Sequence, residues 1–121
     1  MTGKKLMEYC THFTQRVEQG EASEEKIHAY YCLGFIGGAV ESQHFISFYD
    51  AVADKNYRKD MSAKEFNELM RKYRLFCLPK DIYFRDLVPV IVDFGKKHPE
   101  LLNYPAGVLL YSALRHKDPC K

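Results

Sequence analysis

The residues of this chain best suited to chemistry are its four cysteines, Cys10, Cys32, Cys77 and Cys120. Cysteines can bind a metal, attack a substrate or pair into disulfides. Metal-binding cysteines and histidines usually stand in close pairs such as C-x-x-C or H-x-x-x-H, and neither spacing occurs in this sequence. We therefore expect no metal site and no cofactor. A catalytic cysteine with a distant histidine, such as His28 or His98, would account for one thiol and leave three unexplained.

The cysteine positions fit disulfides that each close one helical hairpin. In two antiparallel helices, residues equidistant from the turn face each other, so the midpoint of a bonded pair should lie in the turn. The midpoint of Cys10 and Cys32 is position 21, and that of Cys77 and Cys120 falls between positions 98 and 99. Both positions are predicted turns, and no other pairing closes each hairpin on itself. The alternative is that Cys10 and Cys32 are buried thiols that pack as small apolar residues.

Apolar residues recur at helical spacing along the whole chain and predict about five helices without a convincing strand. One face of the first helix carries Leu6, Cys10, Phe13 and Val17. The polar residues 18–23 end that helix, and Ser23 is a candidate N-cap for a second helix that runs to about Val52. The last helix has Pro105 at its first position.

The boundaries of the third and fourth helices follow from capping residues and a proline. Ser62 with Glu65 three residues later is a capping-box signature, which predicts the start of the third helix. The fourth helix begins either at Asp86, which leaves Pro89 in the first turn, or near Tyr83, which would place Pro89 where it kinks the helix. Together the five helices predict an all-α, single-domain bundle of disulfide-stapled antiparallel hairpins over residues 1–121.

Composition excludes several classes of partner. Of 121 residues, 46% are hydrophobic and 28% charged, which suits one domain with a core of its own. The 18 basic and 16 acidic residues are spread along the chain, so no face is built for phosphates or an anionic membrane. The longest apolar run, Ala29 to Val40, is about half of what a bilayer span needs. We expect neither a nucleic-acid nor a membrane partner.

Three glycines lie inside the second predicted helix, in the stretch "GFIGG": Gly34, Gly37 and Gly38. Glycine in a helix interior costs up to about 1 kcal/mol relative to alanine. We therefore expect another backbone to pack closely against this part of the helix. The polar residues that follow, Glu41, Gln43, His44 and Asp50, do not share one helical face and predict a solvated rim, so nothing here indicates an enzyme.

Four sequence motifs resemble the type VI secretion amidase immunity proteins of Gram-negative bacteria. They are "CLGFIGG" at 32–38, "FCLP" at 76–79, "LVPVIVDFGKKHPELLNYPAGVLLYSAL" at 87–114 and the closing "PC" at 119–120. The resemblance implies a small all-helical periplasmic protein, often a homodimer. Such a protein binds a cell-wall-cleaving amidase effector and occludes its Cys/His active-site groove. It also implies a mature chain whose signal peptide has been removed, because the first ten residues contain no signal-like apolar stretch.

Within that resemblance, the loop between the second and third helices is the predicted contact with the amidase. Tyrosine and arginine are enriched at binding hot spots, and this polar loop contains Tyr57 and Arg58. The candidate partner-binding residues are Asp54, Lys55, Asn56, Tyr57, Arg58, Lys59, Asp60 and Met61, with Lys80 and Asp81 in "PKDIY" as the runner-up segment. The competing interpretation is a cytosolic helical adaptor with free thiols, for which four unpaired cysteines would be expected.

Overall fold

The computed structural model describes residues 1–16 and 24–120, with the side chains of 14–26 left aside. The helices are α1 (Gly3–Arg16), α2 (Glu24–Val52), α3 (Ala63–Arg71), α4 (Phe84–Lys97), the short 3₁₀ helix η2 (Pro99–Asn103) and α5 (Ala106–Lys117). Over these residues no strand forms beyond an isolated β-bridge between Thr2 and Pro105. The predicted all-α fold with five α-helices is confirmed. The predicted Val17, the turn 18–23 and the candidate cap Ser23 lie outside the described residues.

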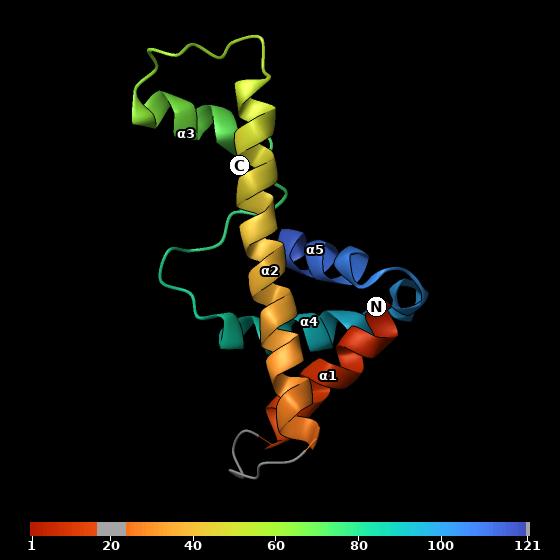
Figure 1. Ribbon diagram of the computed structural model, residues 1–121. Coiled ribbons are helices and arrows are strands. Elements are labelled where there is room, and N and C mark those ends of the chain that lie inside the picture. The colour runs from red at the N-terminus through yellow and green to blue at the C-terminus, as the bar shows by residue number, and fades with distance from the viewer. Residues whose placement is uncertain (17–23, 121) are drawn as a thin grey trace.

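The molecule has two parts joined by α2 (Figure 1). The body consists of α1, α4, η2, α5 and the first two thirds of α2. The distal lobe, residues 44–75, consists of the end of α2, the loop 53–62 and α3, and it projects away from the body. The 29 residues of α2 give a rod about 44 Å long at 1.5 Å per residue. The distal lobe is therefore held out on one continuous helix.

The core lies in the body, where α1, α2, α4 and α5 bury one face each. Helix α2 contributes Ile36 and Val40, and the loop before α4 contributes Phe76, which is 1% exposed. The other fully buried large side chains are Leu6, Leu87, Val88, Ile91, Leu109, Leu110 and Leu114. Their spacing within each helix is the i, i+3, i+4 pattern of an amphipathic helix, so burial of these faces is what assembles the body.

Both predicted disulfides are present. Cys10 bonds to Cys32 and Cys77 bonds to Cys120, each with a Cα–Cα distance of 5.0 Å. The first joins α1 to α2. The second joins the segment before α4 to the end of the chain after α5, where the Cys77 amide also donates to the Asp118 carbonyl at 2.8 Å. No cysteine is free, so the alternative of buried free thiols is wrong.

The helix ends follow local capping chemistry. The predicted capping box is confirmed: the Ser62 hydroxyl accepts from the Glu65 amide at 3.1 Å, and the Glu65 carboxylate accepts from the Ser62 amide at 3.3 Å. Helix α4 begins after Tyr83, which caps it without a side-chain hydrogen bond. Of the two predicted starts the earlier is therefore correct, and Pro89 lies inside the helix. Pro105 is the N-cap of α5 rather than its first residue.

The close backbone packing predicted at the three glycines is not found among the described residues of one chain. A Cβ built on Gly34 or Gly38 would meet no described atom within 4 Å, since both glycines are exposed on the outward face of α2. A Cβ on Gly37 would lie 3.3 Å from the Phe84 ring, which is a side chain rather than a passing backbone. The buried stripe of α2 runs through Ile36 and Val40, so Gly34 and Gly38 fall on the opposite side of the helix.

Candidate functional site

The distal lobe carries a chain of aromatic rings, which we call the distal aromatic cluster: Phe45, Phe48, Tyr49, Tyr57 and Phe66. Its ring centroids are 5.2 Å apart for Phe45 and Tyr49, and 5.5 Å for Phe48 and Tyr49. Phe48 meets Phe66 edge to face at 5.5 Å, and Tyr57 meets Phe66 at 5.9 Å. Edge-to-face contacts of this kind are favourable beyond the area they bury. The cluster thus joins α2, the loop 53–62 and α3.

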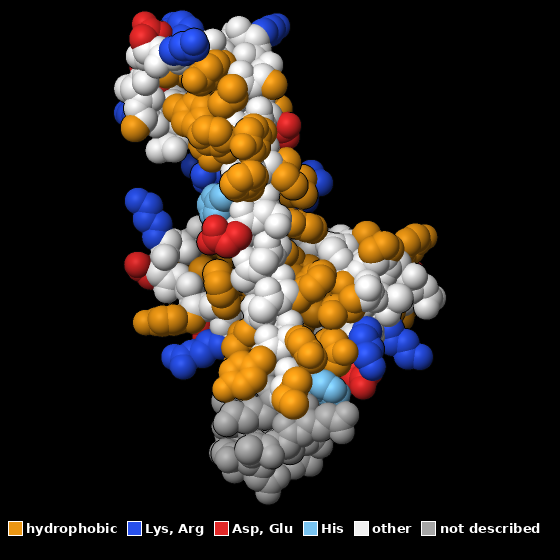
Figure 2. Space-filling model, in the orientation of Figure 1, with side chains coloured by type: hydrophobic (Ala, Val, Ile, Leu, Met, Phe, Trp, Pro, Cys, Tyr) orange, Lys and Arg blue, Asp and Glu red, His pale blue; other side chains and the backbone are white. Residues whose placement is uncertain are grey.

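Much of this cluster is exposed to solvent. Phe45 is 66% exposed, Tyr49 59% and Phe48 45%, and their neighbour Ile46 is 57% exposed. Figure 2 shows hydrophobic side chains gathered over the distal lobe, with charged side chains at its edge. A contiguous apolar patch with a charged rim is typical of a protein-interaction surface.

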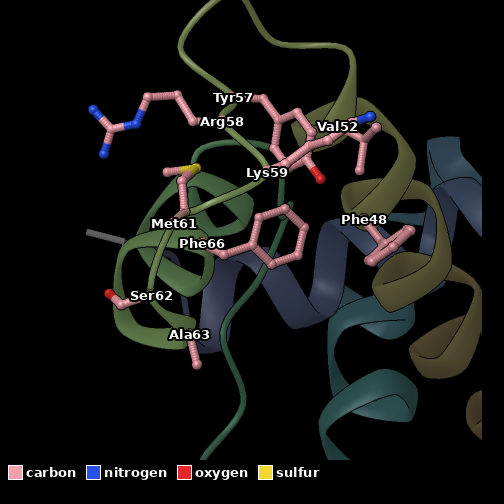
Figure 3. A pocket seen from close by; sticks show the side chains of 9 residues that line it. All are labelled: Phe48, Val52, Tyr57, Arg58, Lys59, Met61, Ser62, Ala63 and Phe66. Atoms are coloured by element: carbon pink, nitrogen blue, oxygen red, sulfur yellow. The ribbon is translucent and has the colours of Figure 1, made fainter.

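A pocket of about 360 Å³ opens between this cluster and the loop 53–62 (Figure 3). The rings of Tyr57, Phe66 and Phe48 lie around it, whereas the Arg58 side chain extends away from the rings. The residues that line it are Phe48, Val52, Tyr57, Arg58, Lys59, Met61, Ser62, Ala63 and Phe66. Four predicted contact residues of the loop are therefore brought together at one pocket.

Asp54 holds the loop in place rather than facing solvent. Its side chain is 3% exposed, and its carboxylate accepts a hydrogen bond from the Tyr73 hydroxyl and from the Asn56 amide at 2.8 Å. The Lys72 ammonium lies 3.1 Å away. The Tyr73 and Asn56 hydrogen bonds and the Lys72 contact lower the pKa of Asp54 from 3.8 to about 2, because each stabilises the charged carboxylate. The hydrogen bond between the Tyr73 hydroxyl and the Asp54 carboxylate also raises the pKa of Tyr73.

A second set of contacts fixes the other end of the loop. The Arg58 guanidinium lies 2.9 Å from the Glu65 carboxylate and 3.6 Å from that of Asp60. Since Glu65 is also the capping-box residue of α3, Arg58 connects the loop to the start of that helix. Arg58 remains 63% exposed, so it can still contact a partner.

The runner-up segment lies elsewhere. Lys80 and Asp81 are exposed in the connection between α3 and α4, away from the aromatic pocket. Lys80 instead lines a separate groove between the distal lobe and the body. The structure therefore brings Tyr57, Arg58, Lys59 and Met61 together and does not join Lys80 or Asp81 to them.

Sequence reasoning missed two features of this region. Gln43, predicted on a solvated rim, is 6% exposed and binds the chain that leaves α3: its amide oxygen accepts from the Leu75 and Phe76 amides at 2.8 and 2.9 Å. Its amide nitrogen donates to the Phe76 carbonyl at 2.9 Å. The sequence feature that could have predicted its burial is its position three residues after Val40, on the buried face of α2. The aromatic cluster was also missed, although "HFISFYD" has more apolar residues than one buried face can use.

The arrangement suits binding rather than catalysis. All four cysteines are bonded, so no thiol is free to act as a nucleophile. In the parts of the chain that the structure describes, no three His, Cys, Asp or Glu side chains gather in a way that would hold a metal ion. The exposed rings, the pocket beside them and the loop held by Asp54 and Arg58 form the largest apolar feature of the distal lobe, with the features expected of a protein-binding surface.

Comparison with known proteins identifies a family. The family model of the Rap1a immunity proteins matches residues 2–120, which is nearly the whole chain. No significant match is found among curated proteins or among solved structures. Since the match spans the body and the distal lobe alike, the chain belongs to the Rap1a immunity proteins, a family of type VI secretion immunity proteins.

Proposed function

We propose that this protein protects its cell by binding a type VI secretion peptidoglycan amidase effector and covering the effector's active-site groove. The observation that carries the proposal is the distal aromatic cluster, exposed on a lobe that projects from the body. A projecting convex lobe can enter a cleft that a flat surface cannot. Inhibition would be stoichiometric, with the loop 53–62 and α3 as the inserted elements.

The rigidity of the lobe supports this mode of inhibition. A segment that must be ordered on binding loses affinity, because its conformational entropy is lost at that moment. Here Asp54 holds the start of the loop and the Ser62 capping box holds its end. Edge-to-face packing of Tyr57 on Phe66 orients an aromatic side chain before any partner arrives.

The proposed location is the periplasm. Two disulfides agree with an oxidising compartment, because thiols in the cytosol are kept reduced. None of the helices described here has the length and apolar character needed to cross a bilayer.

We further propose that the protein forms a homodimer through the outward face of α2. Ile27, Tyr31, Gly34 and Gly38 recur at helical spacing there, and Ile27 and Tyr31 are 54% and 55% exposed. Two exposed glycines four residues apart leave a shallow trough that the tyrosine of a second copy can fill. This interpretation also gives the two glycines a role that packing within one chain does not.

Effector binding is tested with Tyr57→Ala, because Tyr57 lines the pocket and lies away from the outward face of α2. An amidase effector is first identified by pull-down and purified. Its affinity for each variant is measured by calorimetry, and its hydrolysis of peptidoglycan is measured with and without the variant. We expect roughly tenfold weaker binding or more, as for an aromatic hot spot, with a corresponding loss of inhibition.

The matched control is Tyr104→Ala, since Tyr104 is 56% exposed on the body. It should bind and inhibit as the unmodified protein does. If Tyr57→Ala and Tyr104→Ala are equally potent inhibitors, the distal lobe does not cover the effector.

A further inference from the structure

A groove of about 710 Å³ separates the distal lobe from the body. Figure 2 shows a hollow between the distal lobe and the body, with basic, histidine and acidic side chains around it. Its walls come from α2 between Val40 and His44, from the end of α3, and from the segment 76–84. We call it the basic groove, because its charged lining residues are three cations, Arg71, Arg74 and Lys80, and one carboxylate, Glu41.

Arg74 is the cation best placed to attract an anion. Its Nε is buried without a hydrogen-bond partner, and no ion pair joins its guanidinium to a described side chain. A partly desolvated guanidinium interacts more strongly with a carboxylate than a fully hydrated one does. Lys80, exposed on the facing segment, is likewise not paired with a described carboxylate. Arg71 already has an interaction of its own, so the attraction rests on Arg74 and Lys80.

The walls of the basic groove are fixed in advance. Gln43 holds the backbone of Leu75 and Phe76 through three hydrogen bonds of 2.8 to 2.9 Å. One residue further on, Cys77 is bonded to Cys120. A ligand therefore meets cations whose supporting backbone does not need to be ordered on binding.

The basic groove also adjoins the distal aromatic cluster. A second hollow of about 390 Å³ is lined by Phe45, Phe48 and Tyr49 of that cluster, together with Glu41 and His44. Glu41 and His44 line the basic groove as well. The apolar surface and the cationic groove are thus one continuous surface on the same side of α2.

We propose that the basic groove receives an acidic side chain of the effector while the distal aromatic cluster covers the apolar part of the same interface. This inference rests on the function proposed above and adds the chemistry of the contact: an Asp or Glu of the effector pairs with Arg74 and Lys80. Lys80, from the runner-up segment, then belongs to the same binding surface as the loop 53–62.

The test uses Lys80→Glu and Arg74→Gln in the full-length protein, with Lys96→Glu as the matched control, because Lys96 is an exposed lysine on α4 outside the groove. Affinity for the amidase effector is measured at several sodium chloride concentrations. We expect Lys80→Glu to bind roughly tenfold more weakly, as charge reversal at a close pair does, and to show a shallower salt dependence. Arg74→Gln should weaken binding in the same direction, and Lys96→Glu should match the unmodified protein. Thermal melting checks that each variant is folded.

The outcomes separate the two proposals. If the unmodified protein does not bind the effector, the proposed function fails. If it binds, Tyr57→Ala weakens binding, and Lys80→Glu keeps both the affinity and the salt dependence, then the groove inference alone is overturned. Recovery of Lys80→Glu binding by an Asp→Lys or Glu→Lys change in the effector supports the inference. Saturable binding of a free acetylated glutamate peptide, with effector affinity unchanged in both groove variants, would instead make the groove a small-carboxylate site.

Discussion

Two polar side chains, Gln43 and Asp54, hold the backbone of the distal lobe, and each is nearly buried. The Gln43 amide satisfies two backbone N–H groups and one carbonyl that the core would otherwise leave unpaired. The Asp54 carboxylate accepts hydrogen bonds from the Tyr73 hydroxyl and the Asn56 backbone amide. Neither role could be predicted from the sequence, because the partners are distant along the chain. Phe76 lies 33 residues after Gln43, and Tyr73 lies 19 residues after Asp54. Asp54 was predicted to contact a partner, and we now propose that it positions the loop that does so.

The pKa of Asp54 predicts a specific dependence of stability on pH. A carboxylate with a folded pKa of about 2, against an ordinary value of 3.8, stabilises the fold fully above pH 4. That contribution is lost as the pH falls through 2, because the unfolded chain takes up the proton first. We expect Asp54→Asn to lower the free energy of unfolding at pH 7, and the difference from the unmodified protein to shrink between pH 4 and pH 2.

Urea denaturation at pH 7, 4 and 2 measures this difference. The control is Asp60→Asn, because the Asp60 side chain is 87% exposed and should contribute little at any pH. A difference for Asp54→Asn that stays constant down to pH 2 would contradict the assignment.

Among the elements, α3 and α2 show what local sequence predicts and what it does not. The start of α3 was predicted correctly because a capping box is a contact between residues three apart. The glycines of α2 predicted a closely packed backbone, and among the described residues none lies within 4 Å of a Cβ placed on Gly34 or Gly38. The helix η2 and the Thr2–Pro105 bridge were not predicted, because they depend on the first residues returning to the start of α5.

The Cys77–Cys120 disulfide is expected to be the larger stabiliser of the two disulfides in the chain-entropy model. It closes a sequence separation of 43 residues, which corresponds to roughly 4 kcal/mol from the restricted unfolded chain. We expect Cys77→Ala/Cys120→Ala to lower the free energy of unfolding by about that amount, as measured by urea denaturation without reductant. An unfolding midpoint equal to that of the unmodified protein would show that the bridge does not restrain the unfolded chain. The double variant of Cys10 and Cys32 gives the comparison, with a separation of 22 residues.

At the scale of the whole molecule, fold class and disulfide pairing followed from helical periodicity and cysteine positions. The division into a body and a distal lobe did not. Periodicity reports which face of a helix is buried, but not that the end of α2 leaves the body and exposes Phe45 and Tyr49. The proposed dimer surface on α2 could not be predicted for a related reason, because periodicity within one chain carries no information about contacts with a second copy.

The proposed homodimer is tested with Gly38→Arg. A side chain at this position meets no described atom within 4 Å, so the fold should tolerate it, whereas two α2 helices packed at Gly38 should not. Light scattering after gel filtration should give twice 14.2 kDa for the unmodified protein and 14.2 kDa for the variant. Asn67→Arg on the exposed side of α3 is the control and should keep the larger mass. Equal masses for Gly38→Arg and the unmodified protein would place any self-association elsewhere.

The contact between Gln43 and Leu75 bears on whether the distal lobe can be exchanged as a unit. It holds together the two points at which the chain enters and leaves the distal lobe, 2.8 Å apart at the hydrogen-bonded atoms. Residues 44–75 therefore form an insertion with adjoining ends, a geometry in which one segment can be replaced by another without disturbing the rest. We therefore expect the body to keep its fold when residues 44–75 are replaced by a segment of similar end-to-end spacing.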